Sequence, residues 1–199
     1  MNIPTLKLLL ASDYQRFTNS FGGGIKTLFH YFCSNSCMIT LPFRIGSWLK
    51  SKNSMLARLC LIPVKCIYKC NQHITGIQVP LGTDIGGGLL FFHYGCIVIA
   101  TEAHIGKNAS IHQGVTIGRV FAGRKSGIPT IGDNVVIFAG AKILGNIKIG
   151  NNVVIGANAT VTNNVPDNSV VVGSPAKIIS DNSAKCFDEY WTKVFGWNL

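Results

Sequence analysis

The clearest feature of the chain is a hydrophobic pattern that repeats every six residues in its C-terminal half. Aliphatic side chains recur at this spacing without a slip, and a second column of small or aliphatic residues lies two positions earlier in each unit. The first column holds Ile131, Ile137, Ile143, Ile149, Ile155 and Val161, and the second holds Pro129, Val135, Ala141, Ile147, Val153 and Ala159. A period of six fits neither an α-helix nor a single strand, but it is typical of a coil with three flat sides. The pattern therefore predicts a mainly β fold, a left-handed parallel β-helix.

The same period runs upstream but is interrupted at two places. Ile99, Ile105, Ile111 and Ile117 hold one phase, whereas Val79, Ile85 and Phe91 hold another. We expect the β-helix to span residues 76–180, with a phase shift between Phe91 and Ile99 and an inserted loop at residues 119–129. Each coil buries the apolar face of its neighbour, so an interruption exposes apolar surface. The two interruptions are therefore where we expect functional residues.

The two ends of the chain predict caps on this solenoid. Residues 1–75 are apolar and basic, and we expect them to form a short helical segment over the open strand edges of the first coil. Residues 181–199, rich in aromatics, are expected to form a C-terminal cap. The run 38–70 is apolar, but its cations and its central Pro63 argue against a membrane-spanning helix. Packing on the solenoid or on a partner subunit, and peripheral contact with a membrane, both remain open for residues 38–70.

The charge of the chain is concentrated near its N-terminus. The net charge is +10, and residues 1–75 carry nine Lys or Arg against one Asp. Such a surface attracts nucleic acid, anionic lipid or phosphorylated small molecules. No nucleic-acid-binding motif accompanies the charge, so we expect no nucleic-acid partner. The seven cysteines are an odd number and follow no secretory signal, which predicts reduced thiols in the cytoplasm.

The first interruption, LLFFHYGC at 89–96, contains the strongest candidate for catalysis. His93 lies two positions after the inward-facing Phe91, so it should point outward at a corner of the coil. A neutral imidazole can take a proton from a hydroxyl near neutral pH, an effect worth about 10²–10⁴-fold in rate. One turn of 18 residues plus the slip of two places Gln113 over His93 and His112 in the adjacent column. The spacing of the histidines does not predict a metal site.

The second interruption predicts an anion-binding loop. Residues 119–128 carry three cations, Arg124 among them, together with two glycines. Such a loop can close over the phosphates of a nucleotide-pantetheine thioester, whose neutral arm would lie along a flat side of the coil. A solvated basic loop with no ligand is the alternative.

Two long segments carry a family resemblance. IGKNASIHQGVTIG (105–118) and IGDNVVIFAGAKILGNIKIGNNVVIGANATVTNNVPDNSVVVGSPAKII (131–179) resemble the hexapeptide-repeat acetyltransferases, in particular the serine acetyltransferase-like branch. The resemblance implies acetyl-CoA as the donor, no metal, and a homotrimer with active sites between subunits. It also implies that His93 is the catalytic base for direct attack on the thioester. The residues that it places along the donor are Gly118, Ala139, Ala157, Thr162 and Lys177.

Several positions depart from the serine acetyltransferase pattern. Phe92 and Gln78 stand where that branch has aspartates, and Gly127-Ile128 replaces an Arg-His pair that grips the amino acid. An amino-acid carboxylate without a partner costs on the order of 1–3 kcal/mol. We therefore expect a neutral acceptor, as in relatives that O-acetylate sugars, and His93 oriented by Gln78, Glu102 or a backbone carbonyl. The expected acceptor-binding residues are Gln78, Tyr94, His112 and Gln113.

The sequence thus predicts an acetyl-CoA-dependent O-acetyltransferase that acts on a sugar or saccharide intermediate in surface-polysaccharide biosynthesis. Three alternatives stay open: a serine O-acetyltransferase of cysteine biosynthesis, an amino-sugar N-acetyltransferase, and a non-enzymatic β-helix scaffold. We expect the protein in the cytoplasm, either free or at the inner face of the membrane.

Overall fold

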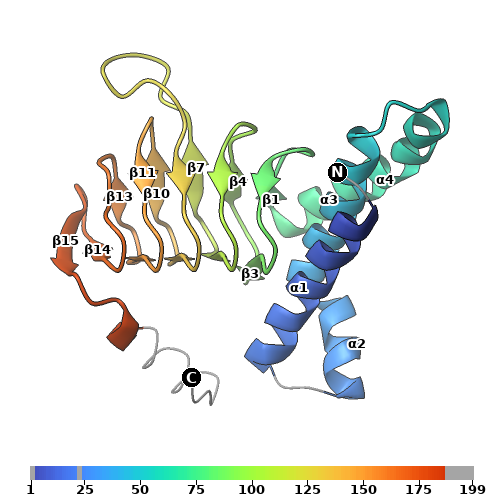
Figure 1. Ribbon diagram of the computed structural model, residues 1–199, viewed down its shortest axis with the longest axis horizontal. Helices are drawn as coiled ribbons and strands as arrows, with labels where there is room; N and C mark the ends of the chain where they lie inside the picture. The colour runs from blue at the N-terminus through green and yellow to red at the C-terminus, as the bar shows by residue number, and fades with distance from the viewer. Residues whose placement is uncertain (1–2, 22–23, 187–199) are drawn as a thin grey trace.

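The protein is a β-helix whose first coil is capped by helices (Figure 1). The computed structural model describes residues 3–21 and 24–186. The helices are α1 (Ile3–Phe21), α2 (Ile25–Cys33), α3 (Asn35–Lys50) and α4 (Met55–Thr75). None of the described helices is both long and apolar enough to cross a membrane.

The strands form three sheets, one for each side of the coil. The first sheet contains β1 (Ile77–Gln78), β4 (Ile97–Ile99), β7 (Thr116–Gly118), β10 (Lys142–Leu144) and β13 (Thr160–Val161). The second contains β2 (Asp84–Ile85), β5 (His104–Ile105), β8 (Thr130–Ile131) and β11 (Lys148–Ile149). The third contains β3 (Leu90–Phe92), β6 (Ser110–His112), β9 (Val136–Ile137), β12 (Val154–Ile155), β14 (Val170–Val172) and the antiparallel β15 (Lys177–Ser180). This architecture confirms the predicted fold class.

The period of six has a direct structural cause. Ile137 pairs with Ile155 and Ile143 with Val161, so a full coil takes 18 residues. The inward columns are buried, and Ile143 and Ile155 are 0% exposed. Burial of each such side chain contributes about 1.5–3 kcal/mol. The stacked aliphatic columns therefore form one continuous core.

Asparagines hold one corner of the coil. Asn134, Asn152 and Asn168 adopt positive φ angles of 55°, 54° and 60°, which asparagine tolerates better than most residues. Their side chains form a ladder in which the Asn134 amide donates to Asn152 at 3.0 Å and the Asn152 amide to Asn168 at 2.9 Å. The ladder fixes this corner from coil to coil.

Both predicted interruptions are present, and a third deviation follows them. Ile77 pairs with Ile97, an offset of 20 positions, so the first coil holds two extra residues. Ile105 pairs with Ile131 across the inserted loop, where Val120 and Gly127 form an antiparallel bridge. The last coil is instead shortened, because Val154 pairs with Val170 at an offset of 16.

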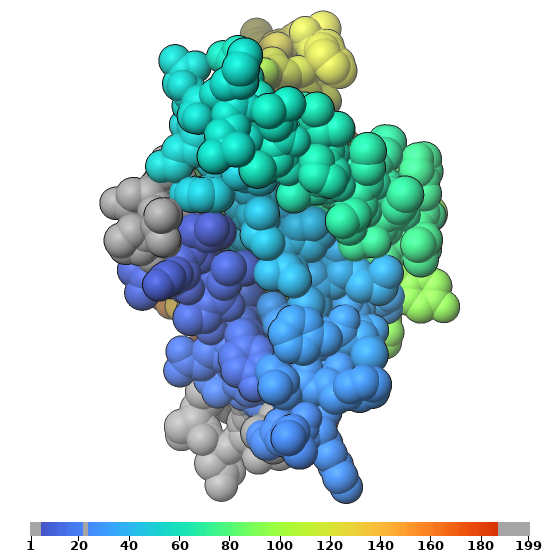
Figure 2. All heavy atoms as spheres, turned by 90° about the vertical axis from the view of Figure 1, so that its right-hand side faces the viewer, coloured from blue at the N-terminus to red at the C-terminus, as the bar shows by residue number. Residues whose placement is uncertain are grey.

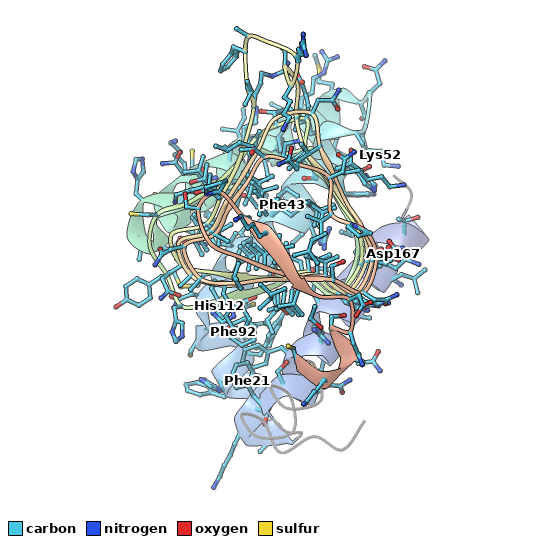
Figure 3. The ribbon with its side chains drawn as sticks, turned by 90° about the vertical axis from the view of Figure 1, so that its left-hand side faces the viewer. Phe21, Phe43, Lys52, Phe92, His112 and Asp167 are labelled. Carbon is cyan, nitrogen blue, oxygen red and sulfur yellow. The ribbon has the colours of Figure 1, made fainter. Side chains whose placement is uncertain are left out.

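The helices cap the solenoid mainly through α3. Phe43 of α3 is 1% exposed and belongs to the solenoid core, and Figure 3 shows it at the end of the triangular coil. Tyr68 of α4 donates its hydroxyl to the Val79 carbonyl at 2.6 Å. Much of α3 is therefore buried against the solenoid, as the packing alternative for residues 38–70 expects, whereas several apolar side chains of α4 are exposed. The part of the expected C-terminal cap from 187 to 199 lies outside the described residues.

A buried ion pair joins α1 to α3 and to the first coil. Arg44, 2% exposed, donates to both carboxylate oxygens of Asp13 at 2.9 and 3.1 Å. It also donates to the carbonyls of Ile85 and Gly86, both at 2.6 Å. The Asp13 carboxylate accepts from the backbone amides of residues 88 and 89 at 2.8 and 2.9 Å. The sequence pattern gave no sign of this network.

Candidate active site

A corner of the coil carries the predicted catalytic residue. The strands of the third sheet align Phe92 with His112, Ile111 with Ile137, and Ile137 with Ile155. The residue two positions beyond the inward aliphatic residue therefore forms a column on successive coils: His93, Gln113, Ala139 and Ala157. Backbone bonds run along it, from the amide of residue 140 to the Gln113 carbonyl at 2.9 Å and from that of residue 158 to the Ala139 carbonyl at 2.8 Å. We call this row the corner column.

His93 occupies the end of the corner column next to the helices. Its side chain is exposed, and its φ of 62° lies in the left-handed region. Such a conformation costs a non-glycine residue about 1–2 kcal/mol and persists only where the surrounding structure enforces it. Here the amide of Gly95 donates to the Thr75 carbonyl at 2.8 Å and ties the corner to the end of α4. The two-residue insertion thus presents the imidazole outward.

His112 lies beside His93 in an aromatic stack. Its ring is stacked between Phe92, at a centroid distance of 4.7 Å, and Phe138, at 5.0 Å. Figure 3 shows Phe92 and His112 projecting from the outer side of the third sheet. Burial, with a smaller contribution from His93, lowers the pKa of His112 from 6.5 to about 4. His112 is therefore neutral at physiological pH and adds no positive charge to the site.

This stack predicts a pH-dependent stability that His112→Phe removes. The unfolded chain binds a proton at this position below pH 6.5, whereas the folded chain binds it only below about pH 4. Stability should therefore fall as the pH drops from 6.5 to 4, by about 2–3 kcal/mol from this group. His112→Phe keeps an aromatic ring in the stack and should flatten that part of the profile. Urea unfolding at pH 4, 5, 6 and 7 measures the effect, and equal slopes for both proteins would contradict it.

A cavity opens between the helices and His93. Its volume is about 450 Å³. Phe17 and Phe21 of α1 line one wall, and His93, Tyr94 and His112 line the other. The remaining lining residues are His30, Cys33, Ser34, Asn35, Ser36, Phe91 and Phe92. The cavity is large enough for a small acceptor, and it places one wall of the site on the N-terminal helices.

The expected acceptor residues divide into those that line the cavity and those that do not. Tyr94 and His112 line the cavity, and Gln113 follows His93 in the corner column. The Oε1 atom of Gln113 is buried and has no hydrogen-bond partner among residues 3–21 and 24–186. Gln78 lies exposed on β1 and is not among the cavity residues. Gln113 is likewise absent from the cavity lining, so only Tyr94 and His112 of the expected acceptor residues face the cavity.

Gln78 and Glu102, the two side chains expected to orient His93, contact other residues in the structure. Glu102 forms an ion pair with Arg119 at the base of the inserted loop. Gln78 pairs in register with Val98. The ring of His93 lies near that of His112, with a centroid distance of 6.3 Å.

The residues expected along the donor lie on two parts of the solenoid. Ala139 and Ala157 belong to the corner column, whereas Gly118 ends β7 and Thr162 follows β13 in the first sheet. Lys125 of the loop donates to the Thr162 carbonyl at 2.6 Å and also contacts Asn163, so the loop leans over the first sheet. Arg124 and Lys177 are exposed. In the described residues no three His, Cys, Asp or Glu side chains cluster as metal ligands would.

The helical wall of the cavity was not predicted from the sequence. Phe17, Phe21, His30 and Asn35 are remote from His93 along the chain, and no motif marks them.

The structure also explains the glycine at 127. Its φ is 136°, and a Cβ there would lie 2.7 Å from the Cβ of Asn146, so the loop has no room for a side chain at this position.

Comparison with known proteins supports the repeat and corrects the expected acceptor. Residues 128–163 match the family model described as bacterial transferase hexapeptide (six repeats). A serine acetyltransferase of Staphylococcus aureus strain Mu50 is 43% identical over 124 residues, which are 62% of this chain and 58% of that protein. One from Staphylococcus xylosus is 44% identical over 142 residues, 70% of this chain and 62% of that protein. The chain thus spans about three fifths of the length of these curated relatives.

Solved structures give the same result. The serine acetyltransferase of Brucella abortus in complex with coenzyme A has a TM-score of 0.75 and 27% identity, over 90% of this chain and 70% of that chain. That of Neisseria gonorrhoeae in complex with serine has a TM-score of 0.74 and 28% identity, over 89% and 70%. These relatives overturn the prediction of a saccharide acceptor and of a polysaccharide-specific branch. Residues 128–163 therefore carry the hexapeptide repeat of the bacterial transferases, within a left-handed parallel β-helix.

Proposed function

We propose that the chain is an acetyl-CoA-dependent O-acetyltransferase with L-serine as its acceptor. The observation that carries the proposal is the corner column, which has an outward histidine at a small cavity and at one end of a row of half-buried or exposed residues. The names of the relatives supply the acceptor and the donor, because similar proteins are serine acetyltransferases and are known in complex with serine and with coenzyme A.

In the proposed reaction, His93 is the general base. Its neutral imidazole takes the proton of the serine hydroxyl while the hydroxyl oxygen attacks the thioester carbonyl carbon of acetyl-CoA. The resulting tetrahedral intermediate collapses, the carbon–sulfur bond breaks, and the imidazolium returns the proton to the departing thiolate. The products are O-acetylserine and CoA, and no acyl-enzyme forms.

The donor would lie along the solenoid beyond His93. Coils of a β-helix are spaced by about 4.8 Å, so Ala157 lies roughly 14 Å from His93 along the axis. We infer that the pantetheine arm follows Ala139 and Ala157, with Gly118 and Thr162 on the adjoining sheet. Arg124 and Lys177 would serve the phosphates of CoA. We also propose that the protein is a homotrimer, as the family resemblance implies. We further propose that it is cytoplasmic and contacts a membrane peripherally.

The acceptor side should show weak recognition of the serine carboxylate. Among the described residues that line the cavity there is no Arg or Lys, so neutral donors would hold the carboxylate. We therefore expect L-serinamide, which lacks that charge, to be acetylated with a kcat/KM within about tenfold of that for L-serine, because a hydrogen bond between neutral groups contributes only about 0.5–1.5 kcal/mol. Steady-state thiol release with both acceptors measures the ratio. A preference for L-serine above about 100-fold would show that a cationic side chain binds the serine carboxylate.

Thiol release also tests the function itself. The purified protein, incubated with acetyl-CoA, should release CoA in proportion to added L-serine. Glucosamine and glucose serve as acceptors of other classes in parallel reactions. Turnover on these sugars with none on serine would contradict the proposal, and so would the absence of turnover on every acceptor together with no binding of CoA.

A further inference from the structure

The helical cap exposes an apolar surface on the side that faces away from the solenoid. Figure 2 shows α4 and α2 on this side of the molecule, with α3 between them. The exposed side chains that define this surface, the α2–α4 face, are Ile25 (84% exposed), Phe29 (73%), Phe32 (57%), Leu59 (59%), Ile62 (59%) and Ile67 (58%). Single exposed apolar residues are common on proteins, but six of them on two helices of the same cap indicate an interaction surface.

A groove between the two helices adds a second observation. It holds about 340 Å³ and is lined by Phe32 of α2, Leu41 and Ile45 of α3, and Val64 and Ile67 of α4. Asn71 is the one polar residue at its wall, and its amide already donates to the Met38 carbonyl at 2.6 Å. The groove thus offers nothing to a polar ligand but fits an apolar one.

The charge of the same helices selects among apolar partners. Lys26 on α2 and Arg58, Lys65 and Lys69 on α4 are all exposed. Between residues 14 and 83 the chain contains no Asp or Glu, and the preceding acid, Asp13, is buried against Arg44. A second copy of this face would bring cations against cations. A surface that is negatively charged and apolar beneath complements both features.

We propose that the α2–α4 face docks on an anionic lipid bilayer. The phenylalanine, leucine and isoleucine side chains enter the interfacial region, and the lysines and the arginine contact lipid phosphates. The helices lie on the bilayer and do not cross it. His30 and Cys33 of α2 line the His93 cavity, so docking would hold the candidate active site close to the membrane.

Vesicle co-sedimentation of the full chain tests this proposal. We expect binding to vesicles of three parts phosphatidylcholine and one part phosphatidylglycerol, and at least about tenfold weaker binding to phosphatidylcholine alone. Lys65→Gln with Lys69→Gln should weaken binding to the anionic vesicles about 10- to 30-fold at low salt, at about 1 kcal/mol per cation. Phe29→Ser with Ile62→Ser should weaken it at least about tenfold.

Matched controls change the same residue types away from the face. Lys107→Gln with Lys148→Gln removes two exposed cations of the solenoid, and Phe121→Ser removes an aromatic side chain that is 85% exposed on the inserted loop. Both controls should bind vesicles like the unchanged protein.

Two results would overturn the lipid proposal. One is no binding to anionic vesicles at low salt. The other is self-association of the protein without vesicle binding, where the double variant Phe29→Ser with Ile62→Ser dissociates the assembly. That result would assign the α2–α4 face to contacts between copies of the chain. Serine acetylation measured in the same preparations keeps a failure here distinct from a failure of the proposed function.

Discussion

Replacement of His93 by alanine should lower kcat for serine acetylation at least about 100-fold with the fold intact. In the proposed mechanism the imidazole takes the hydroxyl proton, and general-base catalysis contributes about 10²–10⁴-fold. The side chain is exposed, so its removal leaves no cavity in the core. Thiol-release kinetics measure the loss, and circular dichroism checks the fold.

His104→Ala is the matched control for this change. His104 is also exposed, but it lies on the second sheet, where it pairs with Asp84 at 2.7 Å. Its removal should leave kcat within about twofold, because surface pairs of this kind contribute 1 kcal/mol or less to stability and the residue lies apart from the cavity. Unchanged kcat in His93→Ala would remove His93 from the mechanism, and equal losses in both variants would point to a general structural effect.

The largest expected loss of stability follows removal of Arg44. Arg44→Met leaves the Asp13 carboxylate buried without its cation and leaves the carbonyls of residues 85 and 86 without their donor. Breaking a buried pair in this way costs about 3–5 kcal/mol. The loss should be concentrated where α1 and α3 meet the first coil. Urea unfolding measures the free energy difference.

Asp84→Ala provides the comparison, because it breaks an ion pair that is exposed to solvent. The expected cost is about 0–1 kcal/mol. A cost for Arg44→Met within the same range would contradict the role of the buried network in holding the helices to the solenoid.

The solenoid could be predicted from the sequence because its cause is local and periodic. Each aliphatic residue of a column contacts its equivalent one coil later, so the pattern and the contact share one period. The two breaks were visible for the same reason, and the first of them correctly placed Gln113 one coil after His93. The shortened last coil was missed, although the sequence marks it: the spacing from Val161 to Val165 is four residues instead of six, and Val165 then pairs with Ile149 at an offset of 16.

The helical cap shows where sequence patterns fail. The apolar runs in α2, α3 and α4 look alike, yet α3 is largely buried and α2 and α4 are exposed on one side. The difference in burial arises because the helices dock onto the first coil through Arg44, Phe43 and Tyr68. Docking depends on pairs of residues far apart along the chain, so no local period records it. The wall that Phe17 and Phe21 give to the cavity was missed for the same reason.

The acceptor was wrongly predicted because the argument rested on missing residues. The loss of an Arg-His pair at 127–128 shows only which groups do not bind the ligand. Gly127 could not carry a side chain in this loop in any case, given its φ of 136° and the closeness of Asn146. A glycine of this kind is required by the geometry of the loop, so its presence says little about the acceptor.

Identification of the product is the most direct test of the proposed reaction. The chain is incubated with L-serine and acetyl-CoA labelled in the acetyl group, the reaction is stopped in acid, and the products are analysed by tandem mass spectrometry, because alkali would move the acetyl group of O-acetylserine onto its α-amino group. We expect labelled serine with the acetyl group on the hydroxyl oxygen and a free α-amino group, in amounts equal to the CoA released, and formed at least about 100-fold more slowly by His93→Ala. Label on the α-amino group of the acid-stopped product, or CoA release without acetylated serine, would contradict the proposed reaction.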